Sequence, residues 1–366
     1  MAIFSSFSWA LKRGVGLIKL VFIVICIFYY YFWNYIPKEL TDTWPRTQPR
    51  DVSTLIQPNH NTFEIVPKGV CDKNSDQPLL LIVVTSAIKN GKARQAIRDT
   101  LSKDAAQYNG QIKVIFLLGM ISNSDHEQNQ ILEGDVGIEA IQFGDVLQAS
   151  FVDSYYRLTI KSLSMLKFFS NHCRSRVKYL MKVDDDTYIN VKEVLKLISV
   201  NTELNLLTGD LISKAAPMTS GKWYAPPHML SPYIKGSTYP DYLSGTTYLM
   251  SHTTADILYR TSMLTPAFPF EDVYITGILP AAYNQKLLGE NREWLDAIVV
   301  SQNEKDNTEM IQIIPKKDNR FQRAKVDLDS CLYSKLISSH GFEPRELIHM
   351  HAVAKSCIKI NGSKVP

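Results

Sequence analysis

The sequence predicts an α/β domain with a mostly parallel β-sheet, covered by helices on both faces and set behind an N-terminal membrane anchor. Residues 79–85 form an unbroken apolar run rich in β-branched residues, as a strand buried on both faces requires, and residues 113–119 and 177–183 repeat this pattern. Helical patterns lie between these runs, and alternation of strands with helices favours a parallel sheet. Because such sheets bind ligands beyond the carboxyl ends of their strands, the residues that follow each run are candidates for a site.

The N-terminal segment has the length and apolarity of a membrane-spanning helix. Leu20 to Trp33 contain no charged residue, and apolar flanks extend the segment to residues 15–36, about the width of a bilayer. Three basic residues lie before the run: Lys12, Arg13 and Lys19. By the positive-inside rule we predict a cytoplasmic tail at residues 1–14, a signal-anchor at 15–36 and a lumenal remainder.

A cleaved signal peptide is the alternative interpretation of this segment. Its apolar core is longer than the roughly 7–15 residues of a usual signal peptide, and no small-residue cleavage site follows. Aromatic residues gather at its far end, as they do at a membrane interface: Tyr29, Tyr30, Tyr31, Trp33 and Tyr35. A retained single-pass type II anchor is therefore favoured.

Residues 37–76 indicate a stem that holds a lumenal domain, residues 77–366, away from the membrane. The segment is polar, lacks sustained periodicity and contains five prolines: Pro37, Pro45, Pro49, Pro58 and Pro67. The domain behind it is long enough to bury a large core. The whole chain has a net charge of +4 from mixed charges, which does not indicate a nucleic-acid surface.

The cysteines are compatible with an oxidising lumen. Cys26 lies inside the expected anchor, and the other four allow three pairings: Cys71, Cys173, Cys331 and Cys357. The polar tail carries one acceptor motif for N-glycosylation, at Asn361.

One helix is expected on each side of the third apolar run. In residues 153–169 the apolar side chains fall on one helical stripe: Tyr155, Leu158, Met165, Leu166 and Phe169. Asp153 or Ser154 is a candidate N-cap of this helix, and Asn190 is the candidate N-cap of the helix at residues 191–198.

Three consecutive aspartates follow the third run directly, at Asp184, Asp185 and Asp186. Asp184 and Asp186 project to the same side of an extended segment, so they can share a divalent cation that also binds phosphate oxygens. Lys182 can offset their charge. A solvated acidic turn is the alternative for an arbitrary aspartate triplet, but its place at the end of a buried strand favours the metal site. An aspartyl-phosphate phosphatase is disfavoured, because its motif requires Thr or Val where this chain has Tyr188.

A second acidic site lies at Glu271 and Asp272, after a proline-rich approach. An acceptor hydroxyl that attacks a sugar needs a base, which a positioned carboxylate can supply. The alternative is that one of the two carboxylates caps a helix. Arg94 and Arg98 are four apart on one helical face, where they can hold a phosphate or pair with a local carboxylate; the residues alone favour the carboxylate.

Six blocks, in order along residues 79–355, resemble the beta-1,3-glycosyltransferases of glycosyltransferase family 31. KARQAIRDT resembles the family's R-x-A-I-R-x-T-W, and VIFLLG resembles its F-L-L-G strand. FGDVLQASFVDSYYRLTIKSL is similar to its Y-G-D-I stretch, which continues to F-x-D-S-Y. YLMKVDDDTYINV resembles the K-x-D-D-D core. The blocks GKWYAPPHMLSPYIKGSTYPDYLSGTTYLMS and FEDVYITGI are similar to the W-Y to Y-P-x-Y stretch and to E-D-V-Y-x-G-I. A short C-terminal stretch, ISSHGFEPRELIHMH, aligns His340 with a family histidine.

The chain departs from the family pattern at several positions. One residue is inserted before Gly277, and other positions carry residues unusual for the family: Leu101, Ser150, Arg157, Thr246 and Thr247. These departures bear on donor and acceptor identity more than on the chemistry.

The resemblance implies a GT-A, Rossmann-like glycosyltransferase fold, a UDP-sugar donor, Mn²⁺ or another divalent cation, and inversion at the anomeric carbon. It implies metal binding by Asp184, Asp186 and His340, with Asp186 as the direct ligand. It places further residues near the UDP-sugar: Arg94, Arg98, Lys182, Asp184 and Asp185. It makes Asp272 the general base and puts others on the acceptor side: Trp223, Tyr224, Tyr242 and Glu271.

We therefore expect a type II Golgi membrane enzyme that transfers a hexose, with galactose favoured, in beta-1,3 linkage to a glycan on a glycoprotein or glycolipid. A non-catalytic sugar-binding protein and a trafficking partner of another transferase are the alternatives. A non-catalytic sugar-binding protein would need no intact base, so Asp272 and the complete aspartate triplet disfavour it.

Overall fold

The computed structural model describes most of the expected lumenal domain. The described residues are 21–28, 50–71, 77–121, 126–225, 229, 234, 238–288, 312–325 and 331–362. The chain divides into two compact units. One comprises Met1–Gln48 and Pro217–His228, and the other comprises Pro49–Ala216 and Met229–Pro366.

Little of the expected anchor falls within the described part of the chain. Residues 21–28 are helical with exposed side chains, whereas the rest of 15–36, the tail 1–14 and residues 37–49 lie outside the described residues. Where the structure is described, no helix combines the length and the apolarity needed to cross a membrane. The anchor therefore stays a prediction from the sequence.

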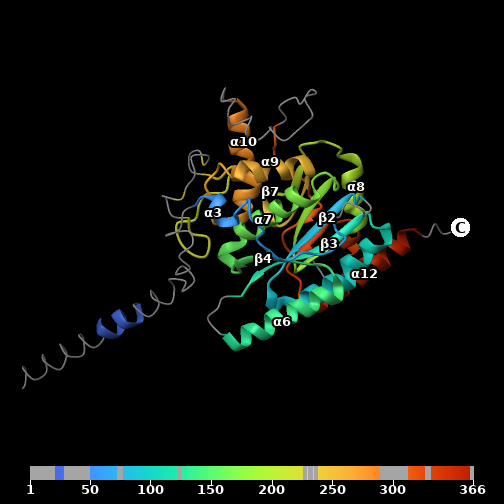
Figure 1. Ribbon diagram of the computed structural model, residues 1–366, viewed down its shortest axis with the longest axis horizontal. Helices are drawn as coiled ribbons and strands as arrows, with labels where there is room; N and C mark the ends of the chain where they lie inside the picture. Colours follow the sequence, from blue (N-terminus) through green and yellow to red (C-terminus); the bar gives the residue numbers. More distant parts are fainter. Residues whose placement is uncertain are drawn as a thin grey trace, which may run out of the picture. The chain divides into compact units, whose positions relative to one another are not determined.

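The larger unit is built on a central β-sheet (Figure 1). This sheet has eight strands in the order β1-β4-β3-β2-β5-β8-β7-β9. Four parallel strands form its core: β2 (Leu80–Thr85), β3 (Ile112–Met120), β4 (Val146–Val152) and β5 (Tyr179–Asp184). All six residues of β2 are buried, as are most of β3 and β5. The three strands expected from the apolar runs are confirmed.

The sheet as a whole is mixed but mostly parallel, as expected, because two of its described strands run against the other six. The flanking strands are β1 (Phe63–Ile65), β7 (Leu207–Ile212), β8 (Tyr242–Ser251) and β9 (Lys316–Lys317). β1 pairs antiparallel with β4, and β8 runs antiparallel to both β5 and β7. The polar residues of β8, which include Ser244 and Thr247, hid this central strand from a search for apolar runs.

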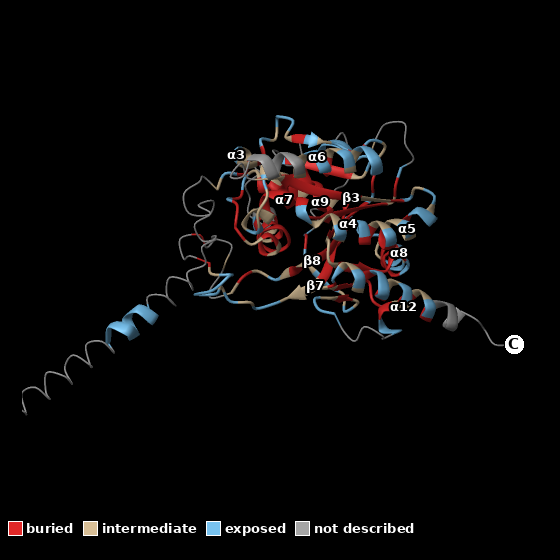
Figure 2. Ribbon diagram, turned by 90° about the horizontal axis from the view of Figure 1, so that it is seen from below, coloured by how far each residue is buried: buried red, intermediate tan, exposed pale blue. Residues whose placement is uncertain are grey.

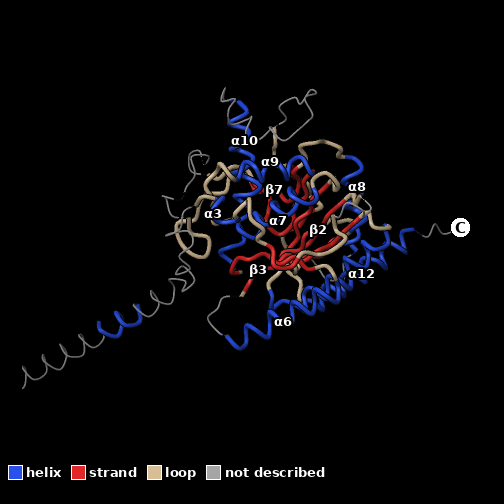
Figure 3. Tube along the Cα trace, viewed as in Figure 1, coloured by secondary structure: helices blue, strands red, loops and turns tan. Residues whose placement is uncertain are grey.

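Helices cover both faces of the sheet, as expected (Figure 3). The α-helices are α3 (Val52–Ile56), α4 (Gly91–Ile97), α5 (Lys103–Ala105), α6 (His126–Phe143), α7 (Leu158–Phe168), α8 (Val191–Val200), α9 (His252–Ser262), α10 (Leu279–Leu288) and α12 (Pro344–Gly362). Shorter helical turns are η2 (Ile88–Asn90), η3 (Arg98–Ser102), η4 (Ala106–Tyr108), η5 (Tyr155–Arg157), η6 (Phe169–Cys173), η8 (Val273–Ile278) and η9 (Cys331–Ser334). Side chains of α4, α8 and α12 share one core with the sheet, and α7 and α9 pack together against strands. Buried residues follow the strands and the inner helix faces (Figure 2).

The helix caps were predicted in part. Asn190 caps α8, since its side chain accepts a hydrogen bond from Glu193 N, as expected. Ser154 occupies the N-cap position of η5, the turn that leads into α7. Asp153 is not the cap: its Oδ2 accepts a hydrogen bond from Lys161 Nζ at 2.7 Å, because burial of that lysine demands a carboxylate partner.

The folded domain begins near residue 50, which corrects the expected stem of residues 37–76. Val52 and Ile56 of α3 are buried, and β1 joins the edge of the large sheet. The ammonium group of Lys167 donates to four oxygens of residues 56–62 at 2.7–2.9 Å. A disulfide joins Cys71 to Cys173. Elements as short as α3 and β1 show no hydrophobic periodicity in the sequence, so they are recognised only from their tertiary contacts.

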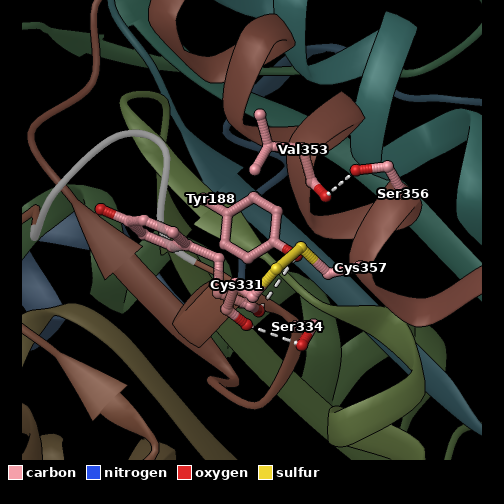
Figure 4. The surroundings of a disulfide bond; sticks show 7 residues. Tyr188, Cys331, Ser334, Val353, Ser356 and Cys357 are labelled. Atoms are coloured by element: carbon pink, nitrogen blue, oxygen red, sulfur yellow. Dashed lines mark hydrogen bonds between the residues drawn. A yellow bond between two sulfur atoms is a disulfide. The ribbon is translucent and has the colours of Figure 1, made fainter. Parts of the chain in front are cut away.

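A second, three-stranded sheet adjoins the end of β5. It has the order β10-β11-β6, with β6 (Thr187–Ile189), β10 (Phe321–Gln322) and β11 (Ser338–His340). β11 runs antiparallel to β6, and this register sets His340 opposite Thr187. The Cys331–Cys357 disulfide ties η9 to α12, with Tyr188 beside it (Figure 4). The sequence left the disulfide pairings open; the structure selects one.

Candidate active site

The three aspartates lie at the junction of the two sheets. Asp184 ends β5, and its Oδ1 accepts a hydrogen bond from Thr85 Oγ1 at 2.9 Å, from the end of the neighbouring β2. The chain then turns and enters β6 one residue after Asp186. Gly341 N and Phe342 N donate to the backbone oxygen of Asp186, which fixes the turn against the segment after β11.

Asp184 and Asp186 lie on the same side, as predicted, and both face His340. One ligand atom from each of these residues lies within 4.8 Å of the other two. His340 Nε2 is 3.1 Å from Asp186 Oδ1 and 4.0 Å from Asp184 Oδ2. Burial would lower the pKa of His340, but the two carboxylates outweigh burial and raise this pKa.

These three residues fit a divalent cation. Asp186 Oδ1 is buried and, within the described part of the chain, has no polar partner besides His340. A buried carboxylate oxygen without a donor is costly unless a cation binds it. Two carboxylates with one imidazole form a mixed oxygen and nitrogen ligand set that suits Mn²⁺ and leaves coordination positions for diphosphate oxygens.

Asp185 faces away from this group, toward the loop that follows β2. Its Oδ2 accepts hydrogen bonds from Ser86 Oγ at 2.6 Å and from Asn90 Nδ2 at 2.9 Å. Burial raises the pKa of Asp185, although these two bonds oppose the change. Asp185 thus attaches the loop at residues 86–90 to the acidic turn.

Arg94 supports the same loop from behind. All five of its N–H groups are used: they reach Ser86, Ala87 and Ile88 of the loop, and both carboxylate oxygens of Glu139. The side chain is 2% exposed. Arg94 therefore lies beside the acidic turn with its N–H groups bonded to protein, and its place near the UDP-sugar stays a prediction.

Arg98 is likewise bound by protein groups. It donates to Asp145 at 2.8 Å and to Glu139 at 2.6 Å, and its guanidinium stacks over the rings of Phe116 and Phe143. A carboxylate pairing, which the residues alone favour, is thus observed, but the carboxylates are distant in sequence and not local as expected. The place of Arg98 near the nucleotide, implied by the family resemblance, stays a prediction. The two carboxylate partners lie 41 and 47 residues away, and only the fold brings them close.

Lys182 connects the two acidic sites. Its buried ammonium donates to Asp184 Oδ1 at 2.5 Å and to the carbonyl oxygen of Gly245 on β8. Burial alone would lower the pKa of Lys182, but Asp184 and Glu271 outweigh burial and raise it. This lysine therefore stays charged and neutralises carboxylates on both sides.

Glu271 lies deep behind β8. Its Oε1 accepts hydrogen bonds from Ser162 Oγ and Tyr248 Oη, both at 2.7 Å. Burial raises the pKa of Glu271, and the neighbouring Asp272 adds to the rise. Because the protein itself supplies both hydrogen-bond donors, we interpret Glu271 as a structural carboxylate.

Asp272 is less enclosed than Glu271 and lies next to Gly245. Its Oδ1 accepts a hydrogen bond from Val273 N at 2.8 Å, so the helix-cap interpretation also holds in part. Burial raises the pKa of Asp272, while Val273 and Lys182 oppose the change. A Cβ on Gly245 would lie 3.2 Å from Asp272 Cβ, so only glycine allows this approach without displacement.

A π-helical turn, η8, follows Asp272 directly. It contains Gly277, before which the family resemblance implies one inserted residue, and single π-turns occur frequently at functional sites. Thr276 Oγ1 donates to Asp272 O at 2.6 Å and accepts from Leu243 N at 2.8 Å. The turn thereby joins the backbone of Asp272 to the start of β8.

The residues expected on the acceptor side fall into both units. Tyr242 stands on β8, and burial followed by Asp272 raises its pKa to about 12. Its ring packs edge to face against Tyr239. Trp223 and Tyr224 belong to the other unit, where Tyr224 forms a β-bridge with Met218.

Several residues of this arrangement were missed by sequence reasoning. They share polar side chains that hold the acids: Thr85, Ser86, Asn90, Ser162, Tyr248 and Thr276. Such residue types are common along any chain, so no signal in a single sequence distinguishes them.

Comparison with known proteins agrees with this arrangement. The family model described as Galactosyltransferase matches residues 92–287, which include both acidic sites. Beta-1,3-galactosyltransferase 1 of Homo sapiens is 30% identical over 308 residues, covering 82% of this chain and 79% of that protein. The same protein of Mus musculus gives the same values.

Two further proteins show how far the similarity reaches. Beta-1,3-galactosyltransferase 2 of Homo sapiens is 25% identical over 419 residues, covering 94% of this chain and 90% of that protein. The crystal structure of mouse xyloside xylosyltransferase 1 in its apo form overlaps with 72% of this chain and 97% of that chain, at 10% identity and a TM-score of 0.31. That score is too low to support an inference about the fold.

Proposed function

Because the chain belongs to the galactosyltransferase family, we propose that it transfers galactose from UDP-galactose to a glycan acceptor in beta-1,3 linkage, with inversion at the anomeric carbon. The names of its relatives, beta-1,3-galactosyltransferases 1 and 2, support the sugar and the linkage. The observation that carries the proposal is the pair of acidic sites on opposite sides of Lys182. One suits a cation, and the other suits a base.

The donor binds at the carboxyl ends of β2 and β5. Asp184, Asp186 and His340 hold the cation, which when bound neutralises the charge of the leaving UDP. The loop at residues 86–90, fixed by Asp185 and Arg94, orients the nucleotide. In this proposal Arg94 acts indirectly. It binds the loop, and the rigid loop presents its backbone groups to the nucleotide.

The acceptor hydroxyl attacks the anomeric carbon from the face opposite the departing UDP. Its proton must go to a group on the acceptor side, because the aspartate cluster is occupied on the leaving-group side. Asp272 takes this proton onto its carboxylate, and its raised pKa makes it a stronger base than an ordinary aspartate. Glu271 already accepts two protein hydrogen bonds and keeps Lys182 and Tyr248 in place.

The protein is further proposed to be a type II membrane protein of the Golgi with its catalytic domain in the lumen. The apolar run of residues 15–36 and its basic flank support this topology, and the two disulfides in the described part of the chain suit an oxidising compartment. Replacing residues 1–40 by a signal peptide should give a secreted, folded protein. An aggregating truncated form, together with a full-length protein that is active without membranes, would contradict the topology.

The activity is tested by measuring UDP release from UDP-galactose, UDP-N-acetylglucosamine and UDP-N-acetylgalactosamine, with a panel of glycan acceptors on protein and on lipid. We expect release with UDP-galactose that depends on acceptor and metal and stops with a chelator. Transfer with another donor only would overturn the proposed sugar. Binding without transfer under all conditions would favour a non-catalytic sugar-binding protein.

A further inference from the structure

A buried lysine lies behind the loop at residues 86–90. Lys161, in α7, is 3% exposed, and its ammonium donates hydrogen bonds to two oxygens at 2.7 Å. One is the backbone oxygen of Ser86, and the other is Oδ2 of Asp153, which neutralises the charge. Burial of an ammonium group is costly unless such partners are present. The proposed catalysis does not use Lys161, although this lysine contacts the loop that orients the nucleotide.

Ser86 connects this lysine to the acidic turn. Its hydroxyl donates to Asp185 Oδ2 at 2.6 Å, and its N–H donates to Leu117 O, on β3, at 3.1 Å. Arg94 Nη1 donates to the same hydroxyl at 3.2 Å. These contacts hold the side chain and the N–H of Ser86, whereas Lys161 holds its carbonyl oxygen. Lys161 therefore sets the orientation of the peptide group that follows Ser86.

The peptide group between Ser86 and Ala87 presents its N–H on the side opposite Lys161. In a trans peptide the carbonyl and the N–H point in opposite directions, and the described chain contains no cis peptide. Ala87 is half-buried, and no described residue accepts a hydrogen bond from its N–H. Because β2 ends at Thr85, this N–H lies at the edge of the sheet that carries the aspartates. It is a candidate donor for a ligand at that edge.

Asp153 holds the Lys161 ammonium at the end of β4. Asp153 N donates to Met120 O at 2.8 Å, which attaches this residue to the end of β3. A Cβ on Gly119 would lie 2.9 Å from Asp153 Cβ and 2.8 Å from Phe151 O, so the close approach of the two strand ends requires glycine. The lysine thus joins the carboxyl ends of β2 and β4 across the end of β3.

Lys167, also in α7, is a natural comparison for Lys161. It is 1% exposed, and its ammonium donates to four oxygens of residues 56–62. That segment leads into β1, at the edge of the sheet. The two lysines share their helix, their burial and protein oxygens as partners, and they differ in the segment that they hold. Of the two, Lys161 contacts the loop of the proposed donor site.

We propose that Lys161 is a positioning residue of the donor site, which holds the Ser86 carbonyl so that the Ala87 N–H donates to an oxygen of the bound nucleotide. The attachment of the loop follows from the contacts, whereas the nucleotide as its ligand rests on the proposed function. A backbone donor that is fixed before binding avoids the entropy cost of ordering the loop, and this increases affinity. Asp153 contributes by keeping the ammonium neutralised and directed at Ser86.

The test is calorimetric titration of the full-length protein in detergent with UDP in the presence of Mn²⁺. Lys161→Met should weaken UDP binding at least about 10-fold, because misplacement of a binding group by about 1 Å can cost about 100-fold. The matched control, Lys167→Met, leaves four oxygens without their donor, so it should lower the melting temperature but leave the UDP affinity of the folded protein unchanged. Lys161→Met combined with Asp153→Asn removes both buried charges together, so it should fold even if the single variant does not, and it should bind UDP as weakly.

Two further measurements show whether Lys161 acts through the loop. Ser86→Ala removes the hydroxyl bonded to Asp185 and keeps the carbonyl bonded to Lys161. Combined with Lys161→Met, it should weaken UDP binding less than the product of the two single effects, because both act on one loop. Amide hydrogen exchange of residues 86–90, measured without nucleotide, should be faster in Lys161→Met and unchanged in Lys167→Met.

UDP affinity like that of the wild type in folded Lys161→Met, or equal weakening in Lys167→Met, would overturn the positioning role. Independent effects of Lys161→Met and Ser86→Ala, or unchanged exchange in the loop, would also overturn it. A wild-type protein that binds UDP but transfers no sugar would overturn the proposed catalysis and leave this inference standing.

Discussion

The two groups of carboxylates on either side of Lys182 differ in how the protein treats them. The side chains of Asp184 and Asp186 are 30% and 39% exposed, and among the described residues one buried oxygen of Asp186 has only His340 as a partner. Glu271, in contrast, is 7% exposed and accepts two hydrogen bonds from the protein. The first group therefore keeps carboxylate oxygens available to bind a ligand, whereas the hydrogen bonds of the second group are made within the protein.

The largest effect of a substitution is expected in the first group, Asp184 and Asp186. Asp186→Ala should abolish metal-dependent binding of UDP-galactose, measured by calorimetry with and without Mn²⁺. The melting temperature should stay within a few degrees, because one of several clustered like charges is removed. Asp99→Ala, an exposed carboxylate on η3, is the matched control. Unchanged donor affinity in Asp186→Ala would show that the cluster is only an acidic turn.

His340→Ala tests whether the imidazole belongs to the same group. A lost ligand should raise the Mn²⁺ concentration for half-maximal transfer by at least about 10-fold, since even indirect partners of metal ligands have effects of that size. The exposed His349→Ala on α12 should leave the metal requirement unchanged. An unaltered requirement in His340→Ala would assign this histidine a structural role in β11.

Substitution of Thr276 tests whether its hydrogen bonds position Asp272 in the second group. Thr276→Val removes the acceptor of Leu243 N and the donor to Asp272 O, so Asp272 should shift and turnover should fall by about 10-fold at unchanged donor affinity. Thr276→Ser keeps both bonds and should retain turnover. Thr261→Val is the control, because its buried hydroxyl has no partner among the described residues. A loss that follows the melting temperature equally in all variants would refute the positioning role.

The smallest effect concerns stability and pH. Burial raises the pKa of Asp272, so the native protein binds a proton at this carboxylate more tightly than the unfolded chain does. Asp272 therefore lowers the free energy of unfolding as the pH rises above about 3.9, the ordinary pKa of an aspartate. Asp272→Asn should therefore be at least as stable as the wild type at pH 7, with an advantage that grows between pH 4.5 and 7. Urea unfolding at these pH values measures it. An advantage that shrinks with rising pH would contradict the raised pKa.

The sequence predicts the parts of this molecule whose signal is local. Buried strands appear as apolar runs, so β2, β3 and β5 were recognised, and the cap at Asn190 follows from a short polar residue before a helical pattern. Asp184 and Asp186 share one side, as predicted from their two-residue spacing, although residues 185 and 186 form a turn and not the extended segment that the prediction assumed.

Features that depend on distant partners could not be predicted in this way. Arg94 finds Glu139 45 residues away, and Glu271 finds Ser162 109 residues away. The early start of the domain depends on Lys167, whose four acceptors lie more than 100 residues before it. A single sequence carries no local trace of such pairs.

The central claim is that Asp272 is the base and Glu271 its structural neighbour, and single-turnover transfer from UDP-galactose tests it most directly. Asp272→Asn keeps the shape and most hydrogen bonds but removes the base. Positioned proton transfer is worth roughly 10²–10⁴ in rate, or about 3–5 kcal/mol of barrier. We predict a loss of that size in Asp272→Asn, with donor affinity and folding little changed. Turnover like that of the wild type in Asp272→Asn, alongside an inactive but folded Glu271→Gln, would contradict the account and move the base to the neighbouring residue.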